Sequence, residues 1–257
     1  MRIRPGLERA ALTDVGCQRE NNEDRFSYWE PDSEADFRVK GRLAIVADGM
    51  GGYEGGQEAS RLAVEAIEHA YRAGDSADPQ ASLTEAFRAA HARIIEEAQL
   101  RPDLHGMGTT CTAVVLLGPD LYYAHVGDSR LYLVNSSSIS KLSHDHSYVG
   151  RLVEQGVISP EQAEQHPQRH VLTAALGAGH EVAPDFSPAP MKLQQGDIVV
   201  LCTDGLWSML RDEEIQSAVC SGDLEKACQK LIETAKQRGG PDNITVQILR
   251  IGSNGNR

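Results

Sequence analysis

Aspartates stand at the ends of several apolar, β-rich runs in this 257-residue sequence. Asp48 closes the run LAIVAD, Asp128 follows LYYAHVG, Asp204 follows IVVLCT, and Asp242 precedes NITVQIL. An aspartate at a strand end is often only a turn residue, but four on strands of one sheet system would bring their carboxylates together. Converging carboxylates repel one another, and a hard divalent cation such as Mg²⁺ or Mn²⁺, rather than Zn²⁺, removes that cost. Gly49, directly after Asp48, would let a backbone carbonyl approach such an ion closely.

A fifth candidate, Asp24, ends the polar segment Asn21-Asn22-Glu23-Asp24, which follows Arg19. Arg19 is the only basic residue between Arg9 and Arg25, and two roles are open to it. Beside carboxylates it could serve as a salt-bridge partner. If those carboxylates already hold metal ions, it could instead clamp a phosphate or carboxylate through two hydrogen bonds.

Competing catalytic motifs do not fit the sequence. The glycine-rich GMGGYEGG at residues 49–56 lacks the GxGxxG register, and no lysine between Lys40 and Lys141 could complete a Walker A loop. No GxSxG nucleophile elbow occurs, because Ser129 in GDSR has no flanking glycine pattern. His144-Asp145-His146 allows two interpretations, a metal-binding histidine pair or a polar loop with one or two satisfied histidines, and we favour the loop.

Apolar periodicity indicates the elements that position these residues. Strands are predicted at residues 43–47, 112–117, 121–126, 131–134, 198–202 and 244–251, each bounded by turn-forming residues. The runs 121–126 and 131–134 are either one interrupted strand or two closely linked strands. Helices with one apolar face are predicted at 59–70, 83–94 and 224–235. Because the strands cluster between the helices, we expect an α+β fold without linker or repeat, in which the polar residues 144–179 form an insertion over a site.

The composition excludes several classes of function. Lysine plus arginine number 25 and aspartate plus glutamate 37, so the formal net charge is −12, which disfavours nucleic-acid binding and docking on anionic membranes. No CxxC pair occurs among the cysteines, so we expect free buried thiols in a reducing compartment. These are Cys17, Cys111, Cys202, Cys220 and Cys228. We see no signal segment and no membrane-spanning run, and we expect a cytoplasmic protein.

Eight segments occur in a fixed order through nearly the whole sequence. They are Thr13–Asp24 (TDVGCQRENNED), Val46–Ser60 (VADGMGGYEGGQEAS), Gly106–Thr112 (GMGTTCT), His125–Leu131 (HVGDSRL), His144–Ile158 (HDHSYVGRLVEQGVI), Leu172–Gly177 (LTAALG), Cys202–Trp207 (CTDGLW) and Gly239–Val246 (GGPDNITV). Each segment alone is a weak signal, and the eight in order are highly specific. With them the chain resembles the PP2C (PPM) family of metal-dependent protein serine/threonine phosphatases, in its compact bacterial form.

The resemblance implies a central antiparallel β-sandwich flanked by helices on both faces (αββα), with residues 1–257 as one domain and a metal cleft at one edge of the sandwich. It also implies two Mn²⁺ or Mg²⁺ ions in that cleft. Asp48 would bridge the two ions, and Gly49 would give its carbonyl oxygen to the second. Asp204 and Asp242 would hold the first ion.

The remaining acidic residues also receive implied roles. Asp24 would contact the second ion through water, with Glu23 nearby. Asp128 would share a third, weaker metal with Asp204, and Asn243 would orient the groups that bind metal.

The implied reaction is hydrolysis of phosphoserine and phosphothreonine in proteins by a metal-activated water, with Arg19 binding the substrate phosphate. A flap over residues 144–179 would lie beside the cleft. The eukaryotic branch of the family has a histidine, a candidate general acid, where this chain has Met50, which has no proton to donate. The leaving group could take its proton from metal-bound water, from His146 or His170 in the flap, or from solvent.

Expected partners are phosphorylated substrate proteins and a cognate bacterial Ser/Thr kinase that the enzyme would oppose, with the chain acting as a monomer. Two alternatives stay open: a pseudophosphatase that binds phosphoproteins without turnover, and a metal phosphoesterase that acts on a small molecule. The acidic composition slightly favours protein substrates with basic flanking residues.

Overall fold

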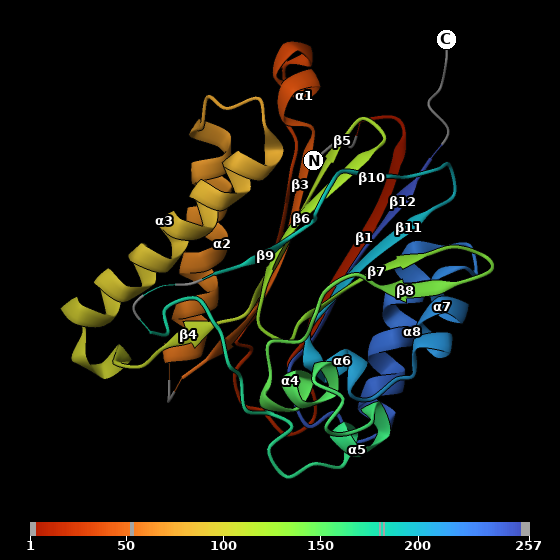
Figure 1. Ribbon diagram of the computed structural model, residues 1–257. Helices are drawn as coiled ribbons and strands as arrows, with labels where there is room; N and C mark the ends of the chain where they lie inside the picture. Colours follow the sequence, from red (N-terminus) through yellow and green to blue (C-terminus); the bar gives the residue numbers. More distant parts are fainter. Residues whose placement is uncertain (1–3, 52–53, 180, 182, 253–257) are drawn as a thin grey trace.

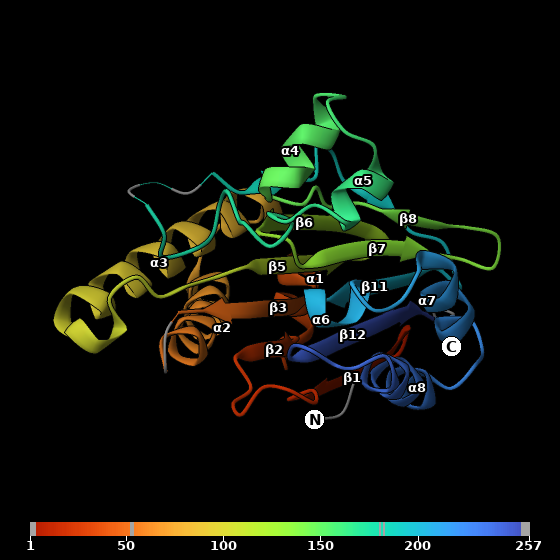
Figure 2. The ribbon, with the colours of Figure 1, turned by 90° about the horizontal axis from the view of Figure 1, so that it is seen from below.

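Two antiparallel sheets pack face to face, and helices cover both outer faces of this sandwich, as Figure 1 and Figure 2 show. The computed structural model describes residues 4–51, 54–179, 181 and 183–252. Within these residues the arrangement of layers is helix, sheet, sheet, helix. The predicted α+β sandwich is confirmed.

The first sheet has five strands in the described part of the chain. In spatial order they are β1 (Leu7–Asp14), β12 (Ile244–Ile251), β11 (Ile198–Cys202), β7 (Arg130–Val134) and β8 (Ile139–Lys141). The main path of the second sheet is β10 (Met191–Lys192), β6 (Asp120–Val126), β5 (Cys111–Leu117), β3 (Arg42–Met50) and β2 (Asp24–Trp29). Two short strands extend it, since β4 (Gly108–Thr109) pairs with β3 and β9 (Asp185–Phe186) pairs with β6.

The helices follow the apolar periodicity of the sequence. Two long ones, α2 (Gly55–Ala73) and α3 (Pro79–Leu100), lie on the second sheet, and α7 (Asp212–Val219) and α8 (Leu224–Gln237) lie on the first. Shorter helices are α1 (Glu34–Lys40), η1 (Pro102–Leu104), α4 (Tyr148–Glu154), α5 (Pro160–Glu164) and α6 (Asp204–Trp207). In Figure 1, α4, α5 and α6 lie at the same end of the sandwich.

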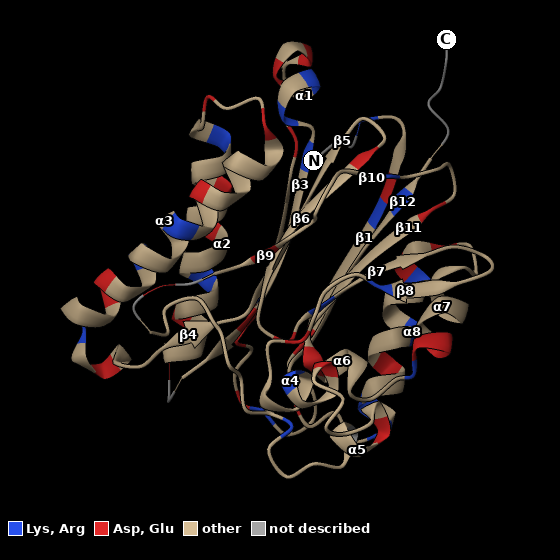
Figure 3. Ribbon diagram, in the orientation of Figure 1, with Lys and Arg blue, Asp and Glu red and all other residues tan. Residues whose placement is uncertain are grey.

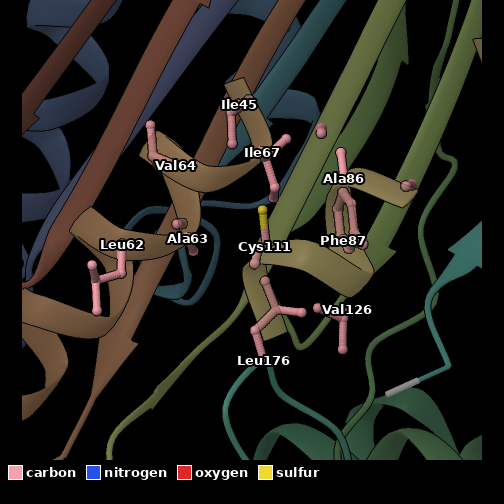
Figure 4. Packing of buried hydrophobic residues seen from close by; sticks show 14 of the residues in the cluster. Ile45, Leu62, Ala63, Val64, Ile67, Ala86, Phe87, Cys111, Val126 and Leu176 are labelled. Atoms are coloured by element: carbon pink, nitrogen blue, oxygen red, sulfur yellow. The ribbon is translucent and has the colours of Figure 1, made fainter. Parts of the chain in front are cut away.

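Three apolar clusters form the core, one in each gap between layers. The first packs α2 and α3 on the second sheet, and Figure 4 shows Ile67 and Phe87 of these helices in the same layer as Cys111 of β5. The second packs α7 and α8 on the first sheet. The third fills the space between the two sheets, where Val46 of β3 and Leu201 of β11 are fully buried. This packing holds the strand ends of both sheets in a fixed relation.

The predicted runs lie in β3, β5, β6, β7, β11 and β12, and the predicted helices lie in α2, α3 and α8, so these assignments are confirmed. Sequence reasoning missed β1 and β2. The strand β1 has few β-branched residues, and it forms because all eight of its residues pair with β12, from Leu7 opposite Ile251 to Asp14 opposite Ile244. Partner strands, rather than local propensity, specify it.

Residues 121–126 and 131–134 form two strands and not one interrupted strand. They belong to different sheets, and the chain crosses between the sheets at residues 127–129. Gly127 makes this crossing with φ of 107°, a backbone conformation that favours glycine. Asp128 therefore lies where the chain passes from the end of one sheet to the end of the other.

The five cysteines are all free, but the expectation that they are buried is wrong for two of them. Cys17 and Cys220 are exposed, whereas Cys111, Cys202 and Cys228 are buried. Among the described helices, none has the length and apolar character needed to cross a membrane. Residues 52–53 of the GMGGYEGG segment lie outside the described residues.

Candidate metal centre

The five candidate aspartates converge at the end of the sandwich where α6 begins. Asp24 opens β2 and lies opposite Asp48 of β3 in the strand register. Asp128 lies in the crossing from β6 to β7, Asp204 is the first residue of α6, and Asp242 comes two residues before β12. Figure 3 shows acidic segments at this end of the sheets, beside α6. Residues far apart in the sequence thus meet at one edge of the sandwich.

The pKa values of these carboxyls show how strongly they interact. Burial, and then repulsion from the other four aspartates, raises the pKa of Asp48 well above its ordinary value. Burial, followed by repulsion from Asp204, raises the pKa of Asp128 to about 8. Burial also raises the pKa of Asp24 to about 7, and burial with repulsion from Asp242 raises that of Asp204 to about 6. The carboxylate cluster therefore holds more negative charge than its surroundings can compensate.

The cluster also has acceptor atoms without a protein partner. Asp24 and Asp128 are buried, while Asp48, Asp204 and Asp242 are partly exposed, so the cluster opens to solvent on one side. Within the described residues, Oδ1 of Asp24 and Oδ1 of Asp204 are buried and accept no hydrogen bond. A buried carboxylate oxygen without a partner is costly, and a divalent cation would satisfy it. These residues fit hard cations with oxygen ligands.

No three of the described His, Cys, Asp and Glu side chains are arranged as a complete ligand set around one ion. Asp242 is turned toward Arg19, whose Nη2 lies 2.8 Å from its Oδ2. Mg²⁺-like ions commonly take one or two protein carboxylates and complete their shell with water, so the arrangement suits such ions without a preformed cage.

Arg19 and Asp242 form an ion pair across 223 residues of sequence, with Arg19 Nη2 donating to Asp242 Oδ2 at 2.8 Å. This hydrogen bond raises the pKa of the Arg19 guanidinium. The Arg19 side chain is 51% exposed, so it is open to solvent at the edge of the cluster. Of the two roles left open by the sequence, the salt bridge is the one observed, and the remaining N–H donors of the guanidinium face an accessible region.

Asn243 ties the segment before β2 to the segment before β12. Its Oδ1 accepts a hydrogen bond from the Glu23 backbone N–H at 2.7 Å. Its Nδ2 donates to the carbonyls of Val15 and Asn21, both at 2.9 Å. The side chain is 3% exposed. Asn243 thereby orients the two loops that carry Arg19, Glu23 and the neighbouring aspartates, and Glu23 itself has a pKa raised mainly by burial.

Gly49 lies where two backbone segments approach closely. A Cβ atom at this position would stand 1.9 Å from the carbonyl oxygen of Gly56, so only glycine fits. The Gly49 N–H donates to the Glu23 carbonyl at 3.2 Å. Its own carbonyl as a metal ligand stays a prediction.

The segment 144–179 packs onto the same end of the sandwich and carries α4 and α5. His146 belongs to its base rather than to a free surface. Its Nδ1 accepts from the Gly127 N–H at 3.3 Å, and its Nε2 contacts Asp185 Oδ2 at 3.2 Å. His144 contacts the same Asp185 oxygen at 3.5 Å. Both ring nitrogens of His146 are therefore engaged, in keeping with the polar-loop interpretation.

His144 and His170 are the exposed histidines of the flap. Burial and then Arg169 lower the pKa of His170, while Asp242 acts on it in the upward direction.

Sequence reasoning missed a second charged network below the flap. Asp145 accepts from Arg130 Nη2 at 2.7 Å and from Lys141 Nζ at 3.0 Å. The Arg130 guanidinium stacks on Trp207, 3.6 Å from the ring centroid, and Trp207 Nε1 donates to the Asp128 carbonyl at 2.9 Å. The network joins the flap base to α6. Its only sequence signal is that these residues, apart from Lys141, lie in the segments that carry the family resemblance.

Comparison with known proteins places this site in context. A family model described as Protein phosphatase 2C matches residues 18–247. The serine/threonine protein phosphatase PstP of Mycobacterium tuberculosis is 38% identical over 245 residues, which is 95% of this chain and 45% of PstP. Protein phosphatase PhpP of Streptococcus pneumoniae is 36% identical over 249 residues, 95% of this chain and 97% of PhpP. The chain thus spans about half the length of PstP and nearly all of PhpP.

Solved structures agree with the fold. A crystal structure of the PstP catalytic domain in complex with two manganese ions superposes with a TM-score of 0.82 at 36% identity, covering 96% of this chain and 99% of that one. The Streptococcus agalactiae serine/threonine phosphatase superposes with a TM-score of 0.87 at 34% identity, covering 95% and 99%. By its matched length, its identity to these relatives and its shared fold, the chain belongs to the protein phosphatase 2C family.

Proposed function

We propose that this chain hydrolyses phosphoserine and phosphothreonine in proteins at a centre of two Mn²⁺ or Mg²⁺ ions. The observation that carries the proposal is the cluster of five converging aspartates, with an exposed arginine at its edge and two buried oxygens that have no partner among the described residues. The relatives named as Ser/Thr phosphatases, and the PstP structure with two manganese ions, support the same chemistry.

The placement of the aspartates supports an assignment of the residues that would hold the ions. Asp48 stands centrally, since the four other aspartates all act on its pKa, which suits a bridging ligand. Asp204 and Asp242 would hold one ion, and the Gly49 carbonyl the other. Divalent ions in such a centre supply positive charge for the phosphoryl group and a water acidified for attack on phosphorus.

The other acidic residues complete the proposed site. Asp24 would act on the second ion through water, with Glu23 beside it, and Asp128 would share a third, weaker ion with Asp204. Asn243 would hold the loops in place through its three hydrogen bonds to backbone groups.

Arg19 would bind the substrate phosphate by exchanging partners. In the structure its guanidinium is occupied by Asp242, and a metal ion on Asp242 would weaken that ion pair. The released guanidinium could then take two phosphate oxygens in its planar fork. The ion pair thus holds the Arg19 guanidinium and the Asp242 carboxylate beside each other before substrate binds.

The proton for the leaving oxygen has fewer sources than the sequence suggested. Met50 has none to donate, and both ring nitrogens of His146 are engaged with Gly127 and Asp185. We therefore propose His170, rather than His146, as the flap histidine that donates this proton, with metal-bound water and solvent as the alternative donors.

We further propose that residues 1–257 act as a single catalytic domain, as a monomer, and oppose a bacterial Ser/Thr kinase by acting on its phosphorylated substrates. The similarity to PhpP over nearly its whole length supports the single-domain assignment. A cytoplasmic location stays a prediction.

The test is phosphate release by the purified chain from phosphoserine and phosphothreonine peptides, with Mn²⁺ and then with excess EDTA. We expect release that requires the metal, and loss of at least about a hundredfold in Asp48→Asn. The matched control is Asp103→Asn, an exposed aspartate paired with Arg101 away from the cluster, which should behave as the wild type. Release that persists in EDTA would refute the metal mechanism. Faster hydrolysis of nucleotides or sugar phosphates would favour a small-molecule substrate, and no turnover at all would favour a pseudophosphatase.

A further inference from the structure

Asp24 is held by hydroxyl groups from the opposite sheet. It opens β2 and is 1% exposed, yet its Oδ2 accepts a hydrogen bond at 2.8 Å from Thr203 Oγ1, which lies between β11 and α6. Burial raises the pKa of Asp24, and the hydroxyls of Thr245, on β12, and of Thr203 both act to lower it. Two side chains thus cross from one sheet to support a single carboxyl of the other.

Thr203 departs from its usual local role. It is the N-cap residue of α6, where a threonine hydroxyl ordinarily accepts a hydrogen bond from a backbone N–H of the first turn. Here the side chain makes no such cap. Its oxygen accepts from the Thr245 backbone N–H at 3.0 Å. Because an N–H only donates, the single hydroxyl proton of Thr203 is left for Asp24.

A second set of hydrogen bonds leads through Asn22 and Thr13 to the Thr245 hydroxyl. The Asp24 backbone N–H donates to Asn22 Oδ1 at 3.0 Å, which assigns Nδ2 as the donor to Thr13 Oγ1 at 2.8 Å. Thr13 Oγ1 lies 2.7 Å from Thr245 Oγ1, so the Thr13 proton is available for Thr245. The Thr245 proton is then available for Asp24.

Both hydroxyls therefore have a proton that they can donate to Asp24, and an ionised carboxylate would accept it. They do so on one side only, because within the described residues Oδ1 of Asp24 is buried and has no partner. Hydroxyl donors fix the direction of this buried carboxyl and favour its ionised form.

We propose that Thr203 and Thr245, supported by Thr13, are positioning residues that hold Asp24 as a directed acceptor, with Oδ1 free for the divalent-cation centre. The inference rests on the proposed function, since it assigns how that centre is assembled. It explains why the N-cap of α6 gives up its capping bond: the hydroxyl serves the carboxyl of another strand.

The test is Mn²⁺ binding to the whole chain by calorimetry at pH 7.5, without substrate. Thr203→Val and Thr245→Val keep the shape of the side chain and remove the hydroxyl. We expect each to raise the dissociation constant for Mn²⁺ about tenfold, the effect of losing one hydrogen bond to a charged group. Thr203→Ser and Thr245→Ser keep the donor and should bind within about threefold of the wild type.

The matched control is Thr112→Val, which removes another buried threonine hydroxyl, bonded to His125 at 2.8 Å and outside the carboxylate cluster. It should lower the melting temperature but leave Mn²⁺ affinity unchanged. If Thr203→Val does not fold, Thr245→Val and its serine counterpart decide the question. Wild-type affinity in the valine variants, or equal weakening in Thr112→Val, would overturn the inference alone. A wild-type chain that binds no Mn²⁺ would overturn the proposed function as well.

Discussion

The stability of the metal-free protein should fall as the pH rises from 6 to 8. Burial raises the pKa of Asp128 to about 8 and that of Asp24 to about 7, with repulsion from Asp204 adding to both. In the unfolded chain an aspartate titrates at about 3.9. Between these values the native state holds protons that the unfolded chain has released, so each rise in pH favours unfolding.

The magnitude follows from the proton difference. Stability due to these carboxyls is fully present below about pH 4 and is lost as the pH passes through the raised native pKa values. A native state that holds one extra proton loses about 1.4 kcal/mol per pH unit, hence about 3 kcal/mol between pH 6 and pH 8. Mn²⁺ at a hundred times its dissociation constant should restore about 2.7 kcal/mol at pH 8.

The assay is urea unfolding at pH 6, 7 and 8, in EDTA and in Mn²⁺, with the wild type and Asp48→Asn compared. The substitution removes a carboxyl whose pKa burial and the four other aspartates raise, so the free energy of unfolding of the variant in EDTA should depend less on pH. Mn²⁺ should also raise the free energy of unfolding of Asp48→Asn only slightly. A metal-free wild type whose stability is flat or rises from pH 6 to pH 8 would refute the reasoning, because the carboxyls would then be compensated without metal.

Two substitutions test the surroundings of the centre. Arg19→Lys should lower kcat/KM for phosphopeptides about tenfold, since lysine lacks the planar fork, while Mn²⁺ affinity measured by calorimetry stays within about threefold. Asp145→Asn should lower the free energy of unfolding by about 2–4 kcal/mol in urea, because it leaves Arg130, which is 19% exposed, without its charged partner.

Both predictions have clear contrary outcomes. An Arg19→Lys variant with wild-type kcat/KM would show that substrate binding does not depend on the guanidinium. A variant that loses Mn²⁺ affinity as strongly as activity would instead assign Arg19 to the assembly of the metal centre. Unchanged stability of Asp145→Asn would show that the network below the flap contributes nothing to folding.

Many of the strands and helices, and the candidate aspartates, are predictable from the sequence because the aspartates follow or precede apolar runs. The buried strands β3, β5 and β11 contain apolar runs, with Asp48 directly after the run in β3 and Asp204 two residues after β11. The order of the motif segments then implies the sandwich and its metal cleft. These features depend on local composition and on spacing, which a sequence displays directly.

What the sequence did not reveal depends on contacts between distant residues. The Arg19–Asp242 ion pair and the hydrogen bond from Thr203 to Asp24 join residues more than 170 positions apart, and no local pattern specifies their direction. The role of His146 was also hidden, because its ring nitrogens are engaged by Gly127 and by a strand that periodicity did not predict. The direction in which a threonine hydroxyl donates depends on the backbone N–H groups beside it, and only the folded chain brings these groups close.

The most direct test of the central claim is the number of Mn²⁺ ions bound per chain at equilibrium, measured with phosphate release in the same titration of EDTA-treated protein. We predict two tightly bound ions in the wild type, with activity that rises as the second site fills. Asp48→Asn should bind fewer ions and release no phosphate. Phosphate release before any ion is bound, or full binding of two ions by Asp48→Asn, would contradict the assignment of the converging aspartates as the catalytic centre.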